Sequence, residues 1–193
     1  MNHESLISLL KETGTLRDGH FVLTSGRHSN QFLLFSQLTQ HPEALEQVCA
    51  AMAAPYLDAG IETVIGPAMG GVVLAYEVAR QIARGGKSRP RAIYTEKAEA
   101  GMALKRGWSL RQGERVLVVE DAVTTGGSVD KCLDAIRPMQ PEIVAVSIIA
   151  DRSGGTVDFR VPMHAVTTLQ IESWLPGDCP LCKQGVPVVK PKS

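Results

Sequence analysis

Two uninterrupted apolar runs constrain the fold of this chain more than any other feature of its sequence. They are residues 115–120 (RVLVVE) and 143–150 (IVAVSIIA). Continuous apolar runs of this length are typical of strands that are buried on both faces, as in a parallel sheet between helices. Helical signals separate the runs, which predicts an α/β fold with a single doubly wound, mainly parallel sheet flanked by helices.

The rest of the chain alternates in the same way. Helices are expected at 4–12, from Pro42 to about residue 58, at about 71–83, and from Gly126 to about residue 137. Strands are expected at 20–23, 31–35, 63–65, 91–94 and 163–168, and a polar loop at 95–107. Pro55 should kink the second helix or end it early. No linker or repeat divides the sequence, so we expect one domain over residues 1–193, with its core sheet at about 60–170.

The composition excludes several classes of function. The 193 residues hold 20 Lys and Arg against 20 Asp and Glu, so the formal net charge is zero. A balanced charge disfavours a protein that binds nucleic acid chiefly through phosphate contacts. No apolar run approaches the roughly 18 residues of a membrane span, and the first residues lack the cleavage site of a signal peptide. We therefore expect a cytoplasmic protein with no membrane or nucleic-acid partner.

The segment that ends the first apolar run carries the strongest functional signal. Residues 120–128 read Glu-Asp-Ala-Val-Thr-Thr-Gly-Gly-Ser, and open α/β sheets bind ligands at the carboxyl ends of their strands. Two carboxylates at a buried strand end need a polar partner, such as a vicinal diol or a magnesium shell. The hydroxyls, the glycines and the start of the next helix offer donors to an anion. The segment predicts a ribose phosphate site; the alternative is a solvated strand end followed by an ordinary helix cap.

This segment closely resembles the phosphoribosyl-diphosphate signature of type I phosphoribosyltransferases. Four more segments resemble orotate phosphoribosyltransferases: 21–29 their N-terminal hood, 66–71 (GPAMGG) their pyrophosphate-side loop, 94–97 the start of their mobile loop, and 150–152 a post-strand arginine that binds orotate. The resemblance implies hood elements at about 1–40. It also implies transfer of ribose 5-phosphate from 5-phospho-α-D-ribose 1-diphosphate (PRPP) to orotate, giving orotidine 5′-monophosphate and diphosphate in pyrimidine (UMP) biosynthesis.

The resemblance also implies the roles of individual residues. Lys97 and Asp121 are the expected catalytic residues, with Lys97 acting in the site of the neighbouring subunit of a homodimer. Thr124 and Arg152 are expected to bind orotate, since the planar guanidinium of Arg152 suits a carboxylate. Mg²⁺ is the expected cofactor, carried by PRPP rather than by protein side chains. The residues expected to bind PRPP are Lys97, Glu120, Asp121, Ala122, Val123, Thr124, Thr125, Gly126, Gly127 and Ser128.

The chain departs from the family pattern in its lysines. Thr24 stands where the family often has a lysine, a lysine common in the second loop is absent from Met69 and Gly70, and only Lys97 remains of a Lys and His pattern in the mobile loop. Lys105 and Arg106 are candidates for neutralising the diphosphate instead; the alternative is that they are solvated surface charges.

Two other functions remain as alternatives. The first is the same transfer to another nucleobase, which the 21–29 segment and Arg152 disfavour, since a neutral base has no carboxylate. The second is a PRPP-sensing regulator that binds nucleic acid, which the zero net charge disfavours.

The cysteines fall into two groups. Cys49 and Cys132 lie in apolar segments and are expected to be buried. Cys179 and Cys182 form Cys-Pro-Leu-Cys, a spacing found in zinc sites and redox motifs. A structural zinc site needs four ligands, and the sequence shows no second pair or nearby histidine. We therefore interpret the pair as a structural turn or adventitious thiols, with a metal site shared between subunits as the alternative.

Overall fold

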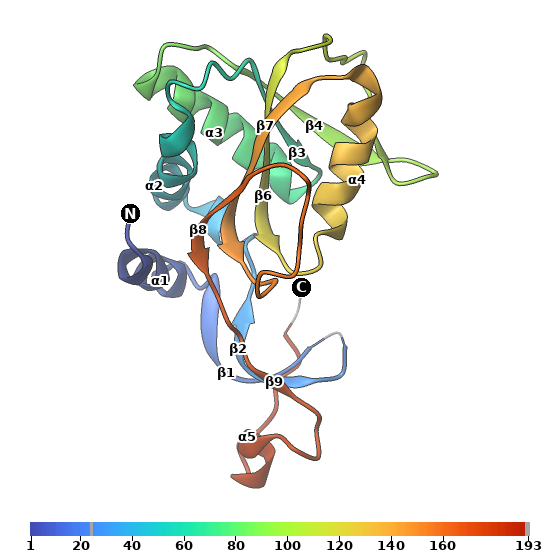
Figure 1. Ribbon diagram of the computed structural model, residues 1–193. Helices are drawn as coiled ribbons and strands as arrows, with labels where there is room; N and C mark the ends of the chain where they lie inside the picture. Colours follow the sequence, from blue (N-terminus) through green and yellow to red (C-terminus); the bar gives the residue numbers. More distant parts are fainter. Residues whose placement is uncertain (24, 192–193) are drawn as a thin grey trace.

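The computed structural model describes residues 1–23 and 25–191, so Thr24, where the sequence departs from the family pattern, lies outside the described residues. The described chain forms a six-stranded sheet and a separate three-stranded sheet. Figure 1 shows the larger sheet between helices and the smaller sheet below it, at the carboxyl ends of β6 and β7. None of the helices in the described part of the chain is long and apolar enough to cross a membrane.

The larger sheet is mainly parallel. Its strand order is β5-β4-β3-β6-β7-β8, and every neighbouring pair is parallel except β4 and β5. The strands are β3 (Thr63–Pro67), β4 (Arg91–Lys97), β5 (Met102–Ala103), β6 (Arg115–Val123), β7 (Glu142–Asp151) and β8 (Met163–Thr168). The predicted fold class is confirmed, and β6, which carries the first of the two apolar runs, lies at the centre of the sheet beside β3.

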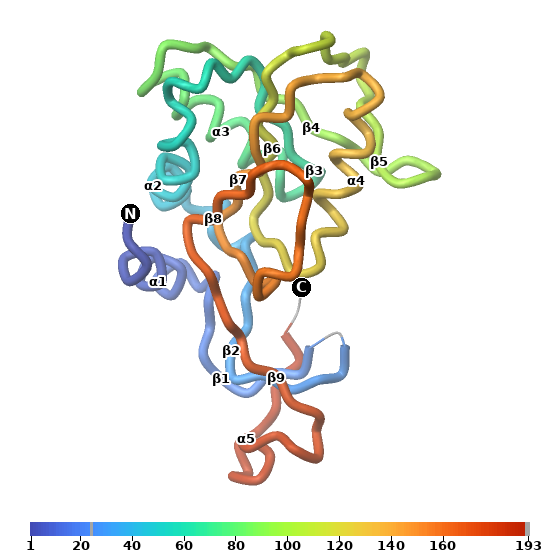
Figure 2. The backbone as a smooth tube through the Cα atoms, in the orientation of Figure 1, coloured from blue at the N-terminus to red at the C-terminus, as the bar shows by residue number. Residues whose placement is uncertain are grey.

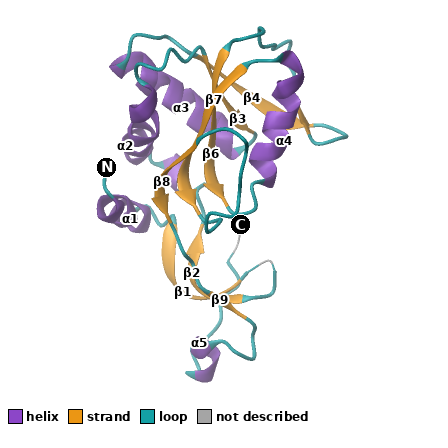
Figure 3. Ribbon diagram, viewed as in Figure 1, coloured by secondary structure: helices purple, strands orange, loops and turns teal. Residues whose placement is uncertain are grey.

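Helices cover both faces of this sheet, as Figure 3 shows with α2 and α3 on one side and α4 on the other. The helices are α1 (His3–Glu12), α2 (Pro42–Ala53), α3 (Gly70–Gly85) and α4 (Gly127–Ile136), with single 3-10 turns at η1 (Leu38–Gln40), η2 (Ala54–Tyr56) and η3 (Arg137–Met139). Along β6, Leu117 and Val119 pack with α2 and α3, whereas Val116 and Val118 pack with α4. Successive strand residues point to opposite faces, which explains why the whole run is apolar.

The smaller sheet joins the two ends of the chain. It consists of β1 (Leu16–Val22), β2 (His28–Leu33) and β9 (Ser173–Trp174), and a short helix, α5 (Pro180–Lys183), follows β9. Figure 2 shows residues 175–191 running beside the β1–β2 hairpin, where Val189 exchanges backbone hydrogen bonds with His20 and Val22. We call the β1–β2 hairpin, β9 and residues 175–191 the hood lobe.

The structure agrees with one expectation about local structure and contradicts another. Pro55 ends α2 early, because the chain passes at Ala54 into the 3-10 turn that contains this proline. The predicted polar loop at 95–107 is wrong over its first half. There β4 extends to Lys97 and forms an antiparallel hairpin with β5, in which Glu96 pairs with Ala103 and Lys97 with Met102.

Candidate active site

A cavity of about 600 Å³ lies at the carboxyl ends of β6 and β7. Asp121 lines it from β6, Arg152 from just beyond β7, and Thr124 from the turn before α4. The loop before α3 contributes Met69, and much of the remaining wall comes from the segment 33–39, which begins at the last residue of β2. The cavity therefore lies where the hood lobe meets the larger sheet, as expected for a ligand site in an open α/β fold.

A smaller hollow of about 170 Å³ adjoins this cavity. Residues 122–129 line it, and it shares Ala122 and Thr124 with the larger cavity. The turn depends on Gly126, whose φ is +80°. A Cβ atom at this position would lie only 2.9 Å from side-chain atoms of Phe159 and Val157. Because α4 begins at Gly127, the free N–H groups of its first turn are available to an anion here.

The two carboxyl groups of β6 are poorly solvated. Glu120 is 8% exposed, and burial, followed by the nearby charge of Asp121, raises its pKa to about 8. Burial also raises the pKa of Asp121, although a hydrogen bond from the Ala122 N–H and the charge of Arg152 act in the opposite direction. Oxygen ligands of this kind suit either ribose hydroxyls or Mg²⁺. A bound cation or hydroxyl would relieve the cost of ionising them.

The GPAMGG loop lies directly against these carboxyl groups. A Cβ atom on Gly70 would lie 3.2 Å from Oδ2 of Asp121, so the loop backbone and the carboxylate are in close contact. The two ends of the loop also approach each other: a Cβ atom on Gly66 would lie 2.6 Å from the carbonyl oxygen of Gly71. Glycine is therefore required at Gly66 by packing alone.

Arg152 brings a positive charge into the cavity. Its backbone N–H donates to the carbonyl oxygen of Val123 at 2.8 Å, which fixes the chain beside the end of β6. Its side-chain Nε is buried, and no hydrogen-bond acceptor for this atom is found within residues 1–23 and 25–191. Burial lowers the pKa of Arg152, and the charge of Asp121 partly offsets this effect. A buried guanidinium with a free donor is suited to an anionic ligand.

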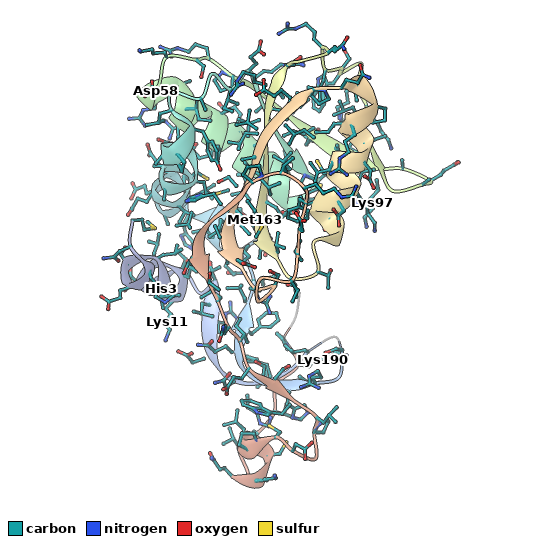
Figure 4. The ribbon with its side chains drawn as sticks, in the orientation of Figure 1. His3, Lys11, Asp58, Lys97, Met163 and Lys190 are labelled. Atoms are coloured by element: carbon teal, nitrogen blue, oxygen red, sulfur yellow. The ribbon has the colours of Figure 1, made fainter. Side chains whose placement is uncertain are left out.

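Lys97 lies apart from these residues. It is exposed at the end of β4, and it lines neither the cavity nor the hollow; Figure 4 shows it beside α4. Lys105 and Arg106 are engaged within the same hairpin. Lys105 Nζ donates to the Lys97 carbonyl oxygen at 2.8 Å, and Arg106 Nε lies 2.8 Å from Glu96 Oε1. The structure thus brings together residues 120–128 and Arg152, but not Lys97.

The structure also contradicts one premise of the sequence analysis, that no histidine lies near Cys179 and Cys182. Histidines do lie near Cys179 and Cys182: the ring nitrogens of His20 and His28 are 3.3–3.7 Å from the two sulfur atoms. Sequence reasoning missed them because they belong to the β1–β2 hairpin, at the opposite end of the chain. It also missed the segment 33–39 as a cavity wall, since nothing in its residue types distinguishes it.

The chain is similar to proteins of known activity. Residues 35–180 match the family described as the phosphoribosyl transferase domain. An orotate phosphoribosyltransferase of Caldicellulosiruptor bescii is 44% identical over 193 residues, which cover 100% of this chain and 98% of that protein. Another from Desulforamulus reducens is 42% identical with the same coverage. The crystal structure of orotate phosphoribosyltransferase from Aeropyrum pernix has a TM-score of 0.71 and 25% identity, and covers 85% of this chain and 93% of that one.

Proposed function

This chain belongs to the orotate phosphoribosyltransferase family, and from that premise we propose that the cavity at the ends of β6 and β7 is its active site. The reaction transfers ribose 5-phosphate from PRPP to orotate and yields orotidine 5′-monophosphate and diphosphate, a step of UMP biosynthesis. One observation carries the placement of the site. Asp121, Thr124 and Arg152, whose Nε atom is buried, line the same cavity, beside a hollow lined by residues 122–129 at the start of α4.

Orotate differs from uracil by a carboxylate, and Arg152 is the group proposed to bind it. The free Nε donor supports this role, because a buried guanidinium without an anion is costly. A planar donor fork can also hold a carboxylate through two hydrogen bonds at once, which orients the ring as well as binding it. Thr124, which shares the cavity, is proposed to donate or accept through its hydroxyl at the other side of the base.

PRPP is proposed to bind across the boundary between the cavity and the hollow. Glu120 and Asp121 would accept hydrogen bonds from the ribose hydroxyls. The 5′-phosphate would occupy the hollow lined by residues 122–129, held by backbone N–H groups and by the hydroxyls of Thr124, Thr125 and Ser128. Lys97 is proposed to contact the diphosphate that is bound in the site of a neighbouring subunit.

Mg²⁺ is the proposed cofactor, and the donor set fits it. Two buried carboxyl groups whose pKa values are raised by burial would gain from a nearby divalent cation, and carboxylate oxygens are the ligands that Mg²⁺ prefers. Bound with the diphosphate, the ion would neutralise charge on the leaving group. Glu120 and Asp121 are the residues that would face it, directly or through water.

The work left to the protein is positioning and charge stabilisation. Departure of diphosphate from the ribose builds positive charge at the sugar, which the carboxylates of Glu120 and Asp121 can stabilise when they are ionised. Arg152 would hold the orotate ring nitrogen in line with the anomeric carbon. The reaction between the two bound substrates then becomes effectively unimolecular. The walls supplied by residues 33–39 would limit access of water to the reacting centre.

We further propose a homodimer in which each site uses Lys97 of the other subunit. The position of Lys97 supports this, because it is exposed on a hairpin away from its own cavity. We also propose that residues 1–193 form one domain, in a cytoplasmic protein whose ligands are small molecules. Pairing of β2 with β9 supports the single domain, since it joins the two ends of the chain.

A turnover assay tests the proposed acceptor directly. Purified protein with PRPP and Mg²⁺ should consume orotate, which is followed by the loss of its ultraviolet absorbance. Parallel reactions with uracil or a purine base in place of orotate should show no comparable product. Preferential consumption of one of these bases would contradict orotate as the acceptor. Omission of Mg²⁺ should slow the orotate reaction strongly.

A further inference from the structure

Four potential metal ligands meet in the hood lobe, far from the active-site cavity. They are His20 on β1, His28 at the start of β2, and Cys179 and Cys182 at α5. Their ligand atoms all lie within 4.8 Å of one another, and His20, His28 and Cys179 are buried. Cys179 and Cys182 are both free thiols. We call these four residues the His₂Cys₂ cluster.

The distances within the cluster match a single tetrahedral ion. Nε2 of His20 and Nδ1 of His28 are 2.9 Å apart. The nitrogen to sulfur distances are 3.4 Å and 3.7 Å from His20 to Cys179 and Cys182, and 3.3 Å from His28 to Cys182. In tetrahedral zinc sites the bonds are about 2.0–2.1 Å to nitrogen and 2.3 Å to sulfur, which places neighbouring ligand atoms roughly 3.3–3.8 Å apart. The three nitrogen to sulfur distances fall in this range, and the nitrogen to nitrogen distance lies roughly 0.4 Å below it. The remaining pairs lie within 4.8 Å, so closure around an ion requires shifts of at most about 1 Å.

The hydrogen bonding of His20 prepares it as a ligand. Its Nδ1 lies 2.8 Å from the carbonyl oxygen of Val186. A carbonyl oxygen can only accept a hydrogen bond, so Nδ1 carries the proton and Nε2 presents its lone pair to the cluster. Metal-binding histidines commonly fix the second ring nitrogen on a backbone carbonyl in this way. The acceptor comes from the C-terminal segment, so both ends of the chain orient this ring.

We propose that His20, His28, Cys179 and Cys182 bind one Zn²⁺ ion as a structural site. Two sulfur and two nitrogen ligands in tetrahedral placement are typical of zinc. A two-iron cluster with the same ligand types divides them between two metal ions, whereas these four atoms are close enough for one. Without a metal, a hydrogen bond from His28 to His20 would satisfy the rings but leave two thiols with only weak partners.

The hood lobe has few buried apolar residues of its own, so a metal ion there would stabilise its structure. Among the buried hydrophobic residues of the described chain, only Phe21 and Cys179 lie outside the two core clusters of the larger sheet, and both belong to this lobe. The helix α5 spans only Pro180–Lys183, too short to be stable by itself. Small units without an apolar core are commonly held by disulfides or metals. Zinc would tie α5 to the β1–β2 hairpin, whose other end leads into the cavity wall.

Metal content of the purified full-length protein tests the proposal without any use of turnover. Protein produced with added zinc and kept reduced should retain roughly one zinc per chain by plasma mass spectrometry. The variant Cys182→Ser should lose it, and an exposed position makes this substitution mild for folding. Cys132→Ala is the matched control, because Cys132 lies on α4 in the main core, outside the cluster. It should retain the metal.

Cobalt provides a measurement that does not depend on the variants. Co²⁺ in place of zinc should give the visible absorption of a tetrahedral site together with a near-ultraviolet thiolate-to-metal band, and the thiol reagent DTNB should modify Cys182 only after chelation. Absence of bound zinc in the reduced wild-type protein would overturn the proposal. Equal zinc in Cys182→Ser, iron in place of zinc, or an octahedral cobalt spectrum would overturn it as well. Since turnover is not measured, these outcomes are independent of the function proposed above.

Discussion

Asp121 and Arg152 face one cavity from neighbouring strand ends, and each opposes the effect of burial on the other's charge. Burial raises the pKa of Asp121 while the Arg152 charge lowers it, and burial lowers the pKa of Arg152 while the Asp121 charge raises it. Asp121 lies on β6 and Arg152 directly follows β7, and the register of the two strands places Val123 beside Asp151. Two oppositely charged residues in one pocket can present a carboxylate to the sugar and a guanidinium to the base.

Arg152→Ala should weaken orotate binding and leave PRPP binding nearly unchanged. Truncating one member of a buried charged pair costs roughly 2–5 kcal/mol, so kcat/KM for orotate should fall about 30-fold or more. Calorimetry with each substrate separately measures the two affinities. Arg89→Ala, at an exposed position outside the cavity, is the control. Loss of PRPP binding with orotate binding intact would place Arg152 on the phosphate side instead.

Asp121→Asn should reduce turnover by about 100-fold or more while the fold survives. The replacement is nearly isosteric, but it removes the negative charge proposed to act at the ribose. Asp134→Asn, an exposed carboxylate on α4 that pairs with Arg137, should behave as wild type. Steady-state kinetics and circular dichroism report on activity and fold. Near-normal turnover in Asp121→Asn would remove this residue from the mechanism.

Glu120→Gln should flatten the pH dependence of thermal stability in the ligand-free enzyme. Burial raises the pKa of Glu120 to about 8, above the roughly 4.3 of glutamate in an unfolded chain. The folded state therefore holds the proton more tightly, and the associated stability is complete below about pH 4 and lost as the pH rises to 8.

The wild-type Tm should accordingly fall between pH 5 and pH 8 by more than that of Glu120→Gln. Scanning calorimetry at several pH values measures both, and Glu43→Gln, at an exposed position, should follow the wild type. Parallel curves for the wild type and Glu120→Gln would show that Glu120 is ionised at neutral pH.

Gly126 and Gly127 should respond differently to the same substitution. Gly126→Ala forces a side chain into a left-handed conformation at φ +80°, with its Cβ atom 2.9 Å from Phe159 and Val157. The cost should be roughly 2–5 kcal/mol of unfolding free energy. Gly127→Ala meets only Thr125 Oγ1 at 3.9 Å and should change stability little. Urea unfolding of the two variants compares them, and equal losses would contradict this account of the turn.

Mixing two inactive variants tests the shared site. Lys97→Ala and Asp121→Asn should each be inactive as pure dimers, but subunit exchange should create hybrid dimers with one intact site. Activity should reappear toward about a quarter of the wild-type level in an equal mixture, because half of the dimers are hybrids and each has one working site. Exchange is verified with differently tagged subunits. A mixture that stays inactive after proven exchange would rule out sharing of Lys97.

Local signals were enough to predict the centre of the fold and most of the residues that meet at the proposed site. The apolar run of β6 and the turn proposed to bind phosphate are contiguous, and a parallel strand buried on both faces is recognisable from its own apolar residues. Arg152 could be placed because it directly follows the second apolar run.

Long-range pairings could not be predicted in the same way. The β4–β5 hairpin depends on only two residue pairs, and its sequence has no alternation that distinguishes strand from loop. The partners of Cys179 and Cys182 lie 154–162 positions earlier in the chain. Nothing near either pair indicates the other, so only the folded chain shows that they meet.

The pairing of β2 with β9 cannot form until most of the chain has been synthesised. Ser29 hydrogen-bonds to the carbonyl of Glu172, which is translated 143 residues later. At about 5–20 residues per second, the β1–β2 hairpin waits roughly 7–30 s on the ribosome for the strand that completes its sheet. During that interval β2 exposes an unpaired edge, a known route to association with other chains. The first residue of β2 is His28, which is buried in the folded chain. Because it is polar rather than apolar, association of other chains with this unpaired edge is less favourable.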